Sequence, residues 1–305
     1  MRIEVQGETR LRFDTGEPVR AASAIARLGD GWLVAQDDAT HAAWCRPAGV
    51  TALRLVPAVG GHEVFSAAAG TKHLKPDFEA ACDVVVDGRP GVLLLGSGST
   101  PARTRACLVA LDSSRPRPYV TDLSPVYAKV VEALGVPDGQ VNLEGACRRG
   151  RWLRWFQRGN ASAGVPSASV DVDYAALLAV VTGAGGAGAV GVGGRRHYDL
   201  GEIDGVGLAV TDAVALPDGR ILLSATAEDT PNAVDDGPVT GSALVLVDDD
   251  RVLSVAGLPE PGGAPYKVEG LAFRDVMADG ALLLAVVDSD DPDVPSAQMT
   301  LRVRW

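Results

Sequence analysis

The chain is poor in the residues that build disulfide frameworks, zinc sites and basic surfaces. Its 305 residues include only four cysteines and four histidines, and neither Cys-x-x-Cys nor His-Glu-x-x-His occurs. A disulfide scaffold or a zinc centre is therefore not expected. Lys and Arg number 28 against 39 Asp and Glu, a formal net charge of −11. This balance argues against a nucleic-acid surface, because phosphate backbones require basic patches.

Long apolar runs are missing as well. No stretch approaches the ~18 apolar residues of a membrane span, and the opening MRIEVQGE has no apolar signal core. Gly-x-Ser-x-Gly, the nucleophile elbow of serine hydrolases, does not occur. These absences predict a cytoplasmic protein that neither enters membranes nor binds nucleic acid; they leave any protein partner unknown.

What the chain does contain is a phrase repeated five times: an oxygen-bearing residue, a very small one, an apolar one, then Ala or Cys. The first residues of the copies are 56, 65, 68 and 57 positions apart, and the step from the last copy round to the first is 59. Such a period indicates a solenoid or a propeller, and the wrap-around step favours a closed ring. The copies are Ser23-Ala24-Ile25-Ala26, Glu79-Ala80-Ala81-Cys82, Glu144-Gly145-Ala146-Cys147, Asp212-Ala213-Val214-Ala215 and Glu269-Gly270-Leu271-Ala272.

Each copy precedes a turn and further strand-like stretches. Asp-Gly pairs such as Asp30-Gly31, Asp218-Gly219 and Asp279-Gly280 separate apolar runs, which is a strong hairpin signal. In most repeats two more runs follow, which makes four strands, the content of a propeller blade. The sequence thus predicts an all-β, five-bladed propeller of four antiparallel strands per blade, in a single domain over residues 1–305. The expected third and fourth strands are 53–56 and 63–65, then 107–111 and 118–120, and in the fourth repeat 244–247 and 252–255.

Two irregularities can be placed. The last repeat has its third strand in 299–305 and no room for a fourth, so residues 2–5 or 11–13 are expected to close the ring and hide its edges. One short helix is expected near 124–134, with Ser124 as N-cap, Pro125 in the first turn and Gly135 at its end.

The polar residue of each phrase begins an innermost strand, which predicts a ring at one mouth of the channel. Carboxylates there repel by roughly 4 kcal/mol per pair at ~4 Å and an effective dielectric of about 20, so either their pKa values rise or a cation lies among them. Oxygen ligands without His or Cys favour a hard cation, Ca²⁺ ahead of Mg²⁺ or Mn²⁺. Such an ion could be structural or catalytic. The predicted ring comprises Ser23, Glu79, Glu144, Asp212 and Glu269.

Four segments resemble stretches of a known family: Leu143 to Cys147 with Arg151 to Phe156, Lys267 to Phe273, Phe78-Glu79-Ala80, and Gln36 to Thr40. That family is the soluble calcium-activated nucleotidases (apyrases). The resemblance implies a five-bladed propeller that hydrolyses nucleoside di- and triphosphates around a calcium held at Ser23, Glu79, Glu144 and Glu269, with Asp212 or Thr211 where that family has serine. The chain is also similar to uncharacterised bacterial phytase- or esterase-like propellers.

Phosphate chemistry requires cations around the transferred group. Arg154 and Arg158 are the predicted phosphate contacts because a guanidinium offers two parallel donors, and Lys75 and Lys267 lie near the starts of inner strands. The alternative interpretation of each is a solvated loop charge.

A base for water is expected in blade one. Asp37 and Asp38 end its second strand, and either could accept a proton from water. The alternative interpretation is a turn-forming Asp pair.

Three functions remain open. The first is a calcium-dependent hydrolase acting on a small anionic phosphoanhydride or phosphoester. The second is a calcium-dependent lactonase or esterase, which would not need the arginine pair. The third is a non-catalytic propeller with a structural metal that binds a ligand or a protein.

Two further motifs are interpreted as loops. Residues 183–188, GAGGAG, match a dinucleotide fingerprint, but no helix opens after them, so a flexible linker within blade three is expected. Asp288, Asp290, Asp291 and Asp293 lack the Gly and terminal Glu of an EF-hand and are expected in a solvated loop.

Overall fold

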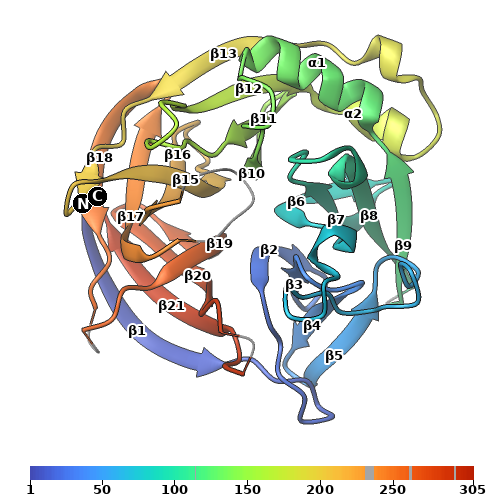
Figure 1. Cartoon of the computed structure of the whole chain (residues 1–305), viewed down its shortest axis with the longest axis horizontal. Coiled ribbons are helices and arrows are strands. Elements are labelled where there is room, and N and C mark those ends of the chain that lie inside the picture. Colours follow the sequence, from blue (N-terminus) through green and yellow to red (C-terminus); the bar gives the residue numbers. More distant parts are fainter. Residues whose placement is uncertain (114, 231–236, 261–262, 292) are drawn as a thin grey trace.

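Five antiparallel sheets surround one central axis (Figure 1). The computed structural model describes all residues except 114, 231–236, 261–262 and 292. The predicted five-bladed propeller is confirmed, with four strands in four blades and a short fifth strand added to the fourth blade.

Within each blade, the four main strands follow chain order from the axis outward, except that β1 is the outermost strand of blade five. Blade one contains β2 (Ala22–Leu28), β3 (Gly31–Gln36), β4 (His41–Arg46) and β5 (Gly49–Arg54); blade two contains β6 (Phe78–Val86), β7 (Arg89–Gly96), β8 (Arg105–Asp112) and β9 (Arg115–Asp122). Blade three contains β10 (Leu143–Arg149), β11 (Trp152–Gln157), β12 (Ser167–Asp173) and β13 (Val192–Tyr198). Blade four contains β15 (Val206–Ala215), β16 (Ile221–Glu228), β17 (Val239–Asp248) and β18 (Arg251–Gly257), with β14 (Glu202–Ile203) beside β15. Blade five contains β19 (Lys267–Met277), β20 (Gly280–Asp288), β21 (Ala297–Arg304) and β1 (Arg2–Arg10).

The ring is closed by the first of the two expected segments. β1 pairs antiparallel with β21, from Arg2 opposite Arg304 to Arg10 opposite Ala297, so both ends of the chain contribute to blade five. Leu11 and Phe13 do not form a fourth strand; they pack into the interface between blades five and one.

Both faces of each sheet are buried, which explains the continuous apolar runs. In β7, Val92 and Leu94 pack against blade one, whereas Leu93 and Leu95 pack against blade three. The described residues form five such apolar clusters, one between each pair of neighbouring blades. Side chains that alternate along a strand therefore bury against different neighbours.

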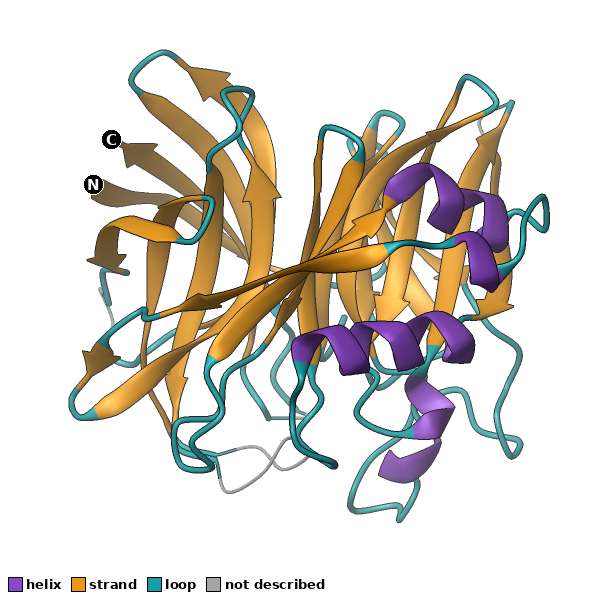
Figure 2. Ribbon diagram, turned by 90° about the horizontal axis from the view of Figure 1, so that it is seen from above, coloured by secondary structure: helices purple, strands orange, loops and turns teal. Residues whose placement is uncertain are grey.

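Two α-helices cover the outer seam between blades two and three (Figures 1 and 2). α1 (Ser124–Leu134) matches the predicted helix and ends at Gly135 with φ of 62°, although Leu123 rather than Ser124 occupies the N-cap. α2 (Tyr174–Val181) was not predicted; the Asp173 side chain caps it by accepting from the Ala176 amide. Short 3₁₀ turns occur at Lys72–Leu74, Pro101–Arg103 and Ala187–Ala189.

The outer half of blade one was predicted wrongly. Its third and fourth strands are β4 and β5, which begin 12 (53 − 41) and 14 (63 − 49) residues before the expected 53–56 and 63–65. After β5, the described residues of this stretch form only two isolated bridges, Val59 with His62 and Ala39 with Val64. The Ala42-Ala43 pair gives β4 low intrinsic strand propensity, and burial between neighbouring blades compensates for it.

Small residues at the axis are required by close backbone approach, as predicted. Gly145 has φ of 79°, and a Cβ atom there would lie 2.7 Å from the Cα of Asp212. At Gly270, a Cβ would lie 2.9 Å from the Cα of Ala24.

We expect Gly145→Ala to lower the free energy of unfolding by about 2–4 kcal/mol, because it adds left-handed strain and a backbone clash. Urea unfolding monitored by circular dichroism measures this. Gly191→Ala is the matched control, since a Cβ there has nothing within 4 Å. Equal stability of the two variants would contradict the crowded axis.

Candidate functional site

A cavity of about 340 Å³ opens at the end of the axis where the inner strands begin. Because each second strand is antiparallel to its inner strand, its end lies beside that inner strand's start. Asp37, Arg158 and Asp288 reach the cavity from the ends of β3, β11 and β20. The charged residues that line it are Arg20, Asp37, Asp38, Lys72, Lys75, Asp77, Glu79, Arg103, Glu144, Arg158, Glu228, Lys267, Glu269, Asp288, Asp290 and Asp291.

Most of the predicted site residues meet here. Four members of the predicted ring line the cavity, together with both proposed bases and three of the four proposed cations. They are Ser23, Glu79, Glu144 and Glu269, then Asp37 and Asp38, then Lys75, Arg158 and Lys267.

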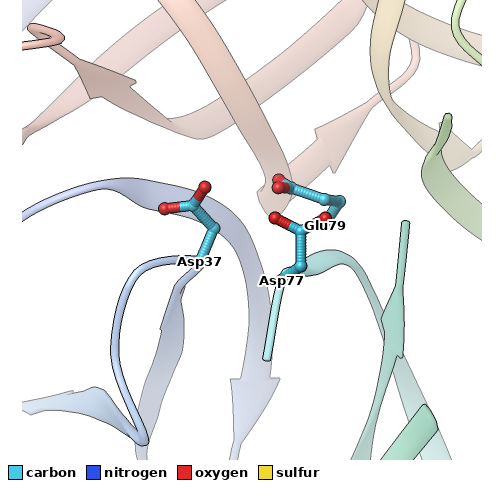
Figure 3. Close-up of side chains that lie close together, drawn as sticks. All are labelled: Asp37, Asp77 and Glu79. Carbon is cyan, nitrogen blue, oxygen red and sulfur yellow. The ribbon is translucent and has the colours of Figure 1, made fainter. Parts of the chain in front are cut away.

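A cluster of three carboxylates lies between blades one and two. Asp37, Asp77 and Glu79 point toward one another (Figure 3), and each offers an oxygen within 4.8 Å of the other two. The Lys75 ammonium lies among them, 2.6 Å from Asp77 Oδ1 and 4.0 Å from Glu79 Oε1, and it also pairs with Asp37. Within the described chain, this is the one group of three or more acidic or metal-ligating side chains so close together.

The backbone at Asp77, which carries one of these carboxylates, is left-handed. Its φ is 60°, left-handed for a non-glycine residue, a conformation that costs of order 1–3 kcal/mol and concentrates at functional sites. The Asp77 side chain is held by the Ser97 hydroxyl and by Arg103, which lies 3.0 Å away. Burial opposes ionisation, but Lys75 and Arg103 outweigh it and keep the pKa of Asp77 below its usual range.

On the opposite wall of the cavity, cationic side chains again lie between carboxylates. Arg158 pairs with Glu144 at 3.1 Å and with Glu228, and its pKa is raised because these carboxylates outweigh burial. Lys267 lies 3.4 Å from Glu269 and 2.9 Å from Asp290. The cations therefore lie between the carboxylates, and most of the repulsion expected at the axis is neutralised by the protein itself.

Neutralisation is incomplete, because ten carboxylates face six cationic side chains. Burial raises the pKa of Asp38 to about 7, and Asp37 adds to the shift. Burial likewise raises the pKa of Glu269 to about 8 and that of Asp288 to about 6. Burial also raises the pKa of Glu79 and of Glu144.

Asp212 lies away from this cavity. Its Oδ1 accepts from the Ala213 amide at 2.7 Å and its Oδ2 from the Leu271 amide at 2.6 Å, so it joins the inner strands of blades four and five. The strand register explains the difference: the bulged position occupied by Ser23 in blade one is Thr211 in blade four. Both hydroxyls donate to a carbonyl of the next blade at 2.6 Å, Ser23 to Phe78 and Thr211 to Val268.

Arg154 is also remote from the cavity. It is 1% exposed and pairs with Asp171 at 2.9 Å and with Asp249 at 3.0 Å. Arg149 and Arg196 bind the same Asp249 oxygen, each at 2.7 Å. Three arginines of blade three thus hold a turn of blade four, and Arg154 is not available to a ligand in the axial cavity.

Several lining residues were missed by the sequence reasoning. Asp288, Asp290 and Asp291, expected in a solvated loop, line the cavity. Asp77, Arg103 and Glu228 had no assigned role. Antiparallel pairing is the sequence signal that could have identified Glu228 and Asp288, because a charged residue at the end of a second strand lies beside the start of the inner strand of its blade. Asp77 and Arg103 lie in connections between strands, and the path of these connections is defined only by the complete fold.

Comparison with known families places the chain. A model of a family of unknown function (DUF6910) matches residues 71–292, and the chain belongs to this family. No curated protein matches it. Among the described residues, no helix combines the length and apolar character needed to cross a membrane.

Solved structures with a similar fold are distant. A luciferin-regenerating enzyme shares 11% identity at a TM-score of 0.42, covering 95% of this chain and 79% of its own. The glutaminyl cyclase of Myxococcus xanthus shares 10% at 0.47, covering 99% and 97%. A protein of unknown function from Dyadobacter fermentans shares 15% at 0.37, covering 98% and 71%. Likenesses this low carry no argument about activity.

We expect Asp212→Ala to lower the free energy of unfolding by about 2–4 kcal/mol, because it leaves two buried amide donors without acceptors. Calcium affinity, measured by titration calorimetry, is expected to stay unchanged because Asp212 does not line the cavity. Asp218→Ala, at an exposed turn, is the control and should change stability by less than about 1 kcal/mol. Loss of calcium binding without loss of stability would restore Asp212 as a ligand.

Proposed function

We propose that the protein is a calcium-dependent hydrolase whose active site is the axial cavity. The observation that carries this is the Asp37, Asp77 and Glu79 cluster, beside which Asp38 offers a carboxylate oxygen to the cavity. Strained backbone, buried carboxylates and a concave polar site at the propeller axis support a functional rather than a purely structural role.

The residues fit a hard cation in ligand type and spacing. Three carboxylates within 4.8 Å of one another can supply oxygens to one ion, and Ca²⁺ prefers such ligands and completes its shell with water. The Lys75 ammonium lies in the same space. A bound calcium would therefore compete with the Lys75 ammonium for these carboxylates.

Residues of the protein supply the catalytic roles other than that of the ion. A bound calcium would supply Lewis-acid polarisation of the bond to be cleaved. Asp38 accepts the proton from the attacking water, because its Oδ1 is buried and has no hydrogen-bond partner in the described part of the chain. Asp37 belongs to the ion cluster rather than to proton transfer, since its carboxylate is paired with Lys75.

Charge favours a neutral carboxylic ester or lactone over a phosphoester. Lys75, Arg158 and Lys267 are each paired with carboxylates, and the lining carries four more carboxylates than cations. This carboxylate excess weakens the attraction for a dianionic phosphate, even beside one Ca²⁺. The nucleotidase activity implied by the apyrase resemblance is the second candidate, supported by Glu79, Glu144 and Glu269 at the axis.

Calcium binding tests the ion site directly. By titration calorimetry, we expect Lys75→Met to bind Ca²⁺ at least about tenfold more tightly, because the competing ammonium is gone, and Asp77→Asn to bind it at least about tenfold more weakly. Lys267→Met is the charge-matched control and should have the smaller effect, since Lys267 pairs with other carboxylates. If Lys75→Met binds no calcium and melts at lower temperature, the cluster is a structural ionic network.

Hydrolysis tests the reaction. We expect calcium-dependent cleavage of 4-nitrophenyl acetate or γ-butyrolactone that stops on adding chelator, and a rate at least about 100-fold lower in Asp38→Asn. Asp218→Asn is the control. Phosphate release from UDP, GDP or ADP in place of ester cleavage would establish the nucleotidase candidate. No turnover on either class, with calcium bound, would leave the non-catalytic propeller.

A further inference from the structure

Most charged groups around the cavity are paired with one another. The buried polar atoms that have no partner therefore indicate which hydrogen-bonding groups a ligand would supply. Six buried atoms on residues that line the cavity have no hydrogen-bond partner among the described residues. Two of them, Asp77 Oδ1 and Arg103 Nε, belong to side chains that are already ion-paired, Asp77 with Lys75 and Arg103 with Asp77. The other four are Arg20 Nε, Asp38 Oδ1, Gln140 Oε1 and Asn160 Nδ2. A buried polar atom without a partner costs about 1–3 kcal/mol, and the cost is removed when a ligand or water supplies the partner.

Asn160 is the best defined of the four. The residue is 8% exposed, its backbone is fixed by two hydrogen bonds with Val165, and its Oδ1 accepts from the Ala163 amide at 3.1 Å. The hydrogen bond to Oδ1 fixes the carboxamide orientation, so Nδ2 is the unsatisfied donor.

The four groups divide evenly between two sides of the ring. Blade one supplies a donor from Arg20 and an acceptor from Asp38, and blade three supplies a donor from Asn160 and an acceptor from Gln140. Arg20 has no ion pair in the described structure, although Asp38 is close enough to feel its charge. On each side, a ligand would therefore have to accept one hydrogen bond and donate another.

We infer that the cavity binds a small, neutral, polyhydroxylated molecule of the sugar class between blades one and three. A hydroxyl both donates and accepts, so neighbouring hydroxyls satisfy a donor–acceptor pair at each end. The carboxylate excess disfavours an anion, and a volume of about 340 Å³ lies within the range of small-molecule sites. As a substrate class, this rests on the proposed hydrolase function; as a ligand class, it does not.

Binding is tested without turnover, using D-glucose, D-xylose and myo-inositol as probes, with glucose 6-phosphate and malonamide for comparison. Saturation-transfer NMR and calorimetry are run in calcium and in chelator. We expect millimolar or tighter binding of at least one polyol and weaker binding of the phosphate. Tighter binding of glucose 6-phosphate, preference for malonamide, or no polyol binding would overturn the inference.

Variants locate the site. Asn160→Asp keeps the oxygen that accepts from Ala163 and removes the donor, so polyol affinity should fall about tenfold or more, as it should in Arg20→Met. Arg27→Met, on blade one outside the cavity lining, is the control; melting temperatures verify folding. Unchanged affinity in both test variants would contradict the assigned contacts. Polyol binding without hydrolysis would remove the enzyme and keep the ligand class, whereas calcium-dependent hydrolysis without polyol binding would do the reverse.

Discussion

The site depends on one electrostatic constraint: carboxylates crowded around the propeller axis must be neutralised, as the Lys75 ammonium neutralises Asp37, Asp77 and Glu79. Five inner strands begin around one axis, and four of them bring a polar side chain (Ser23, Glu79, Glu144 or Glu269) into a space too small to hydrate many charges. Carboxylates can remain there only if cations lie between them or protons bind them. Lys75, Arg158 and Lys267 supply the cations, and raised pKa values at Asp38 and Glu269 show where they do not suffice.

The architecture could be predicted because its signals are periodic. Turn residues, the repeated phrase and the wrap-around step identify blades, closure and α1 without tertiary information. Blade one and α2 show the limit. β4 is rich in alanine and α2 follows an Asp cap within a long connection, so in both cases packing against neighbouring elements decides the structure more than local propensity does.

The site was only partly predictable because spacing specifies which strand carries a residue but not its bulge or its partners. A one-residue difference in register places Thr211 where Asp212 was expected. Arg154 and Arg158 lie four positions apart on one strand and its continuation, yet one is enclosed by Asp171 and Asp249 and the other reaches the cavity. Such differences depend on loops from other blades, and their positions are set by the complete fold.

The pairing of β1 with β21 also has a consequence for how the protein acquires its structure. Blade five joins β1 to β21, whose paired residues are nearly 300 positions apart, as in Arg2 opposite Arg304, so during synthesis β1 stays unpaired until β21 has emerged. Sheet contacts of such separation are slow to form, and an unpaired strand is exposed to wrong partners meanwhile. Arg2, Glu4, Glu8 and Arg10 place charge along that strand, which discourages intermolecular pairing while the nascent chain is incomplete.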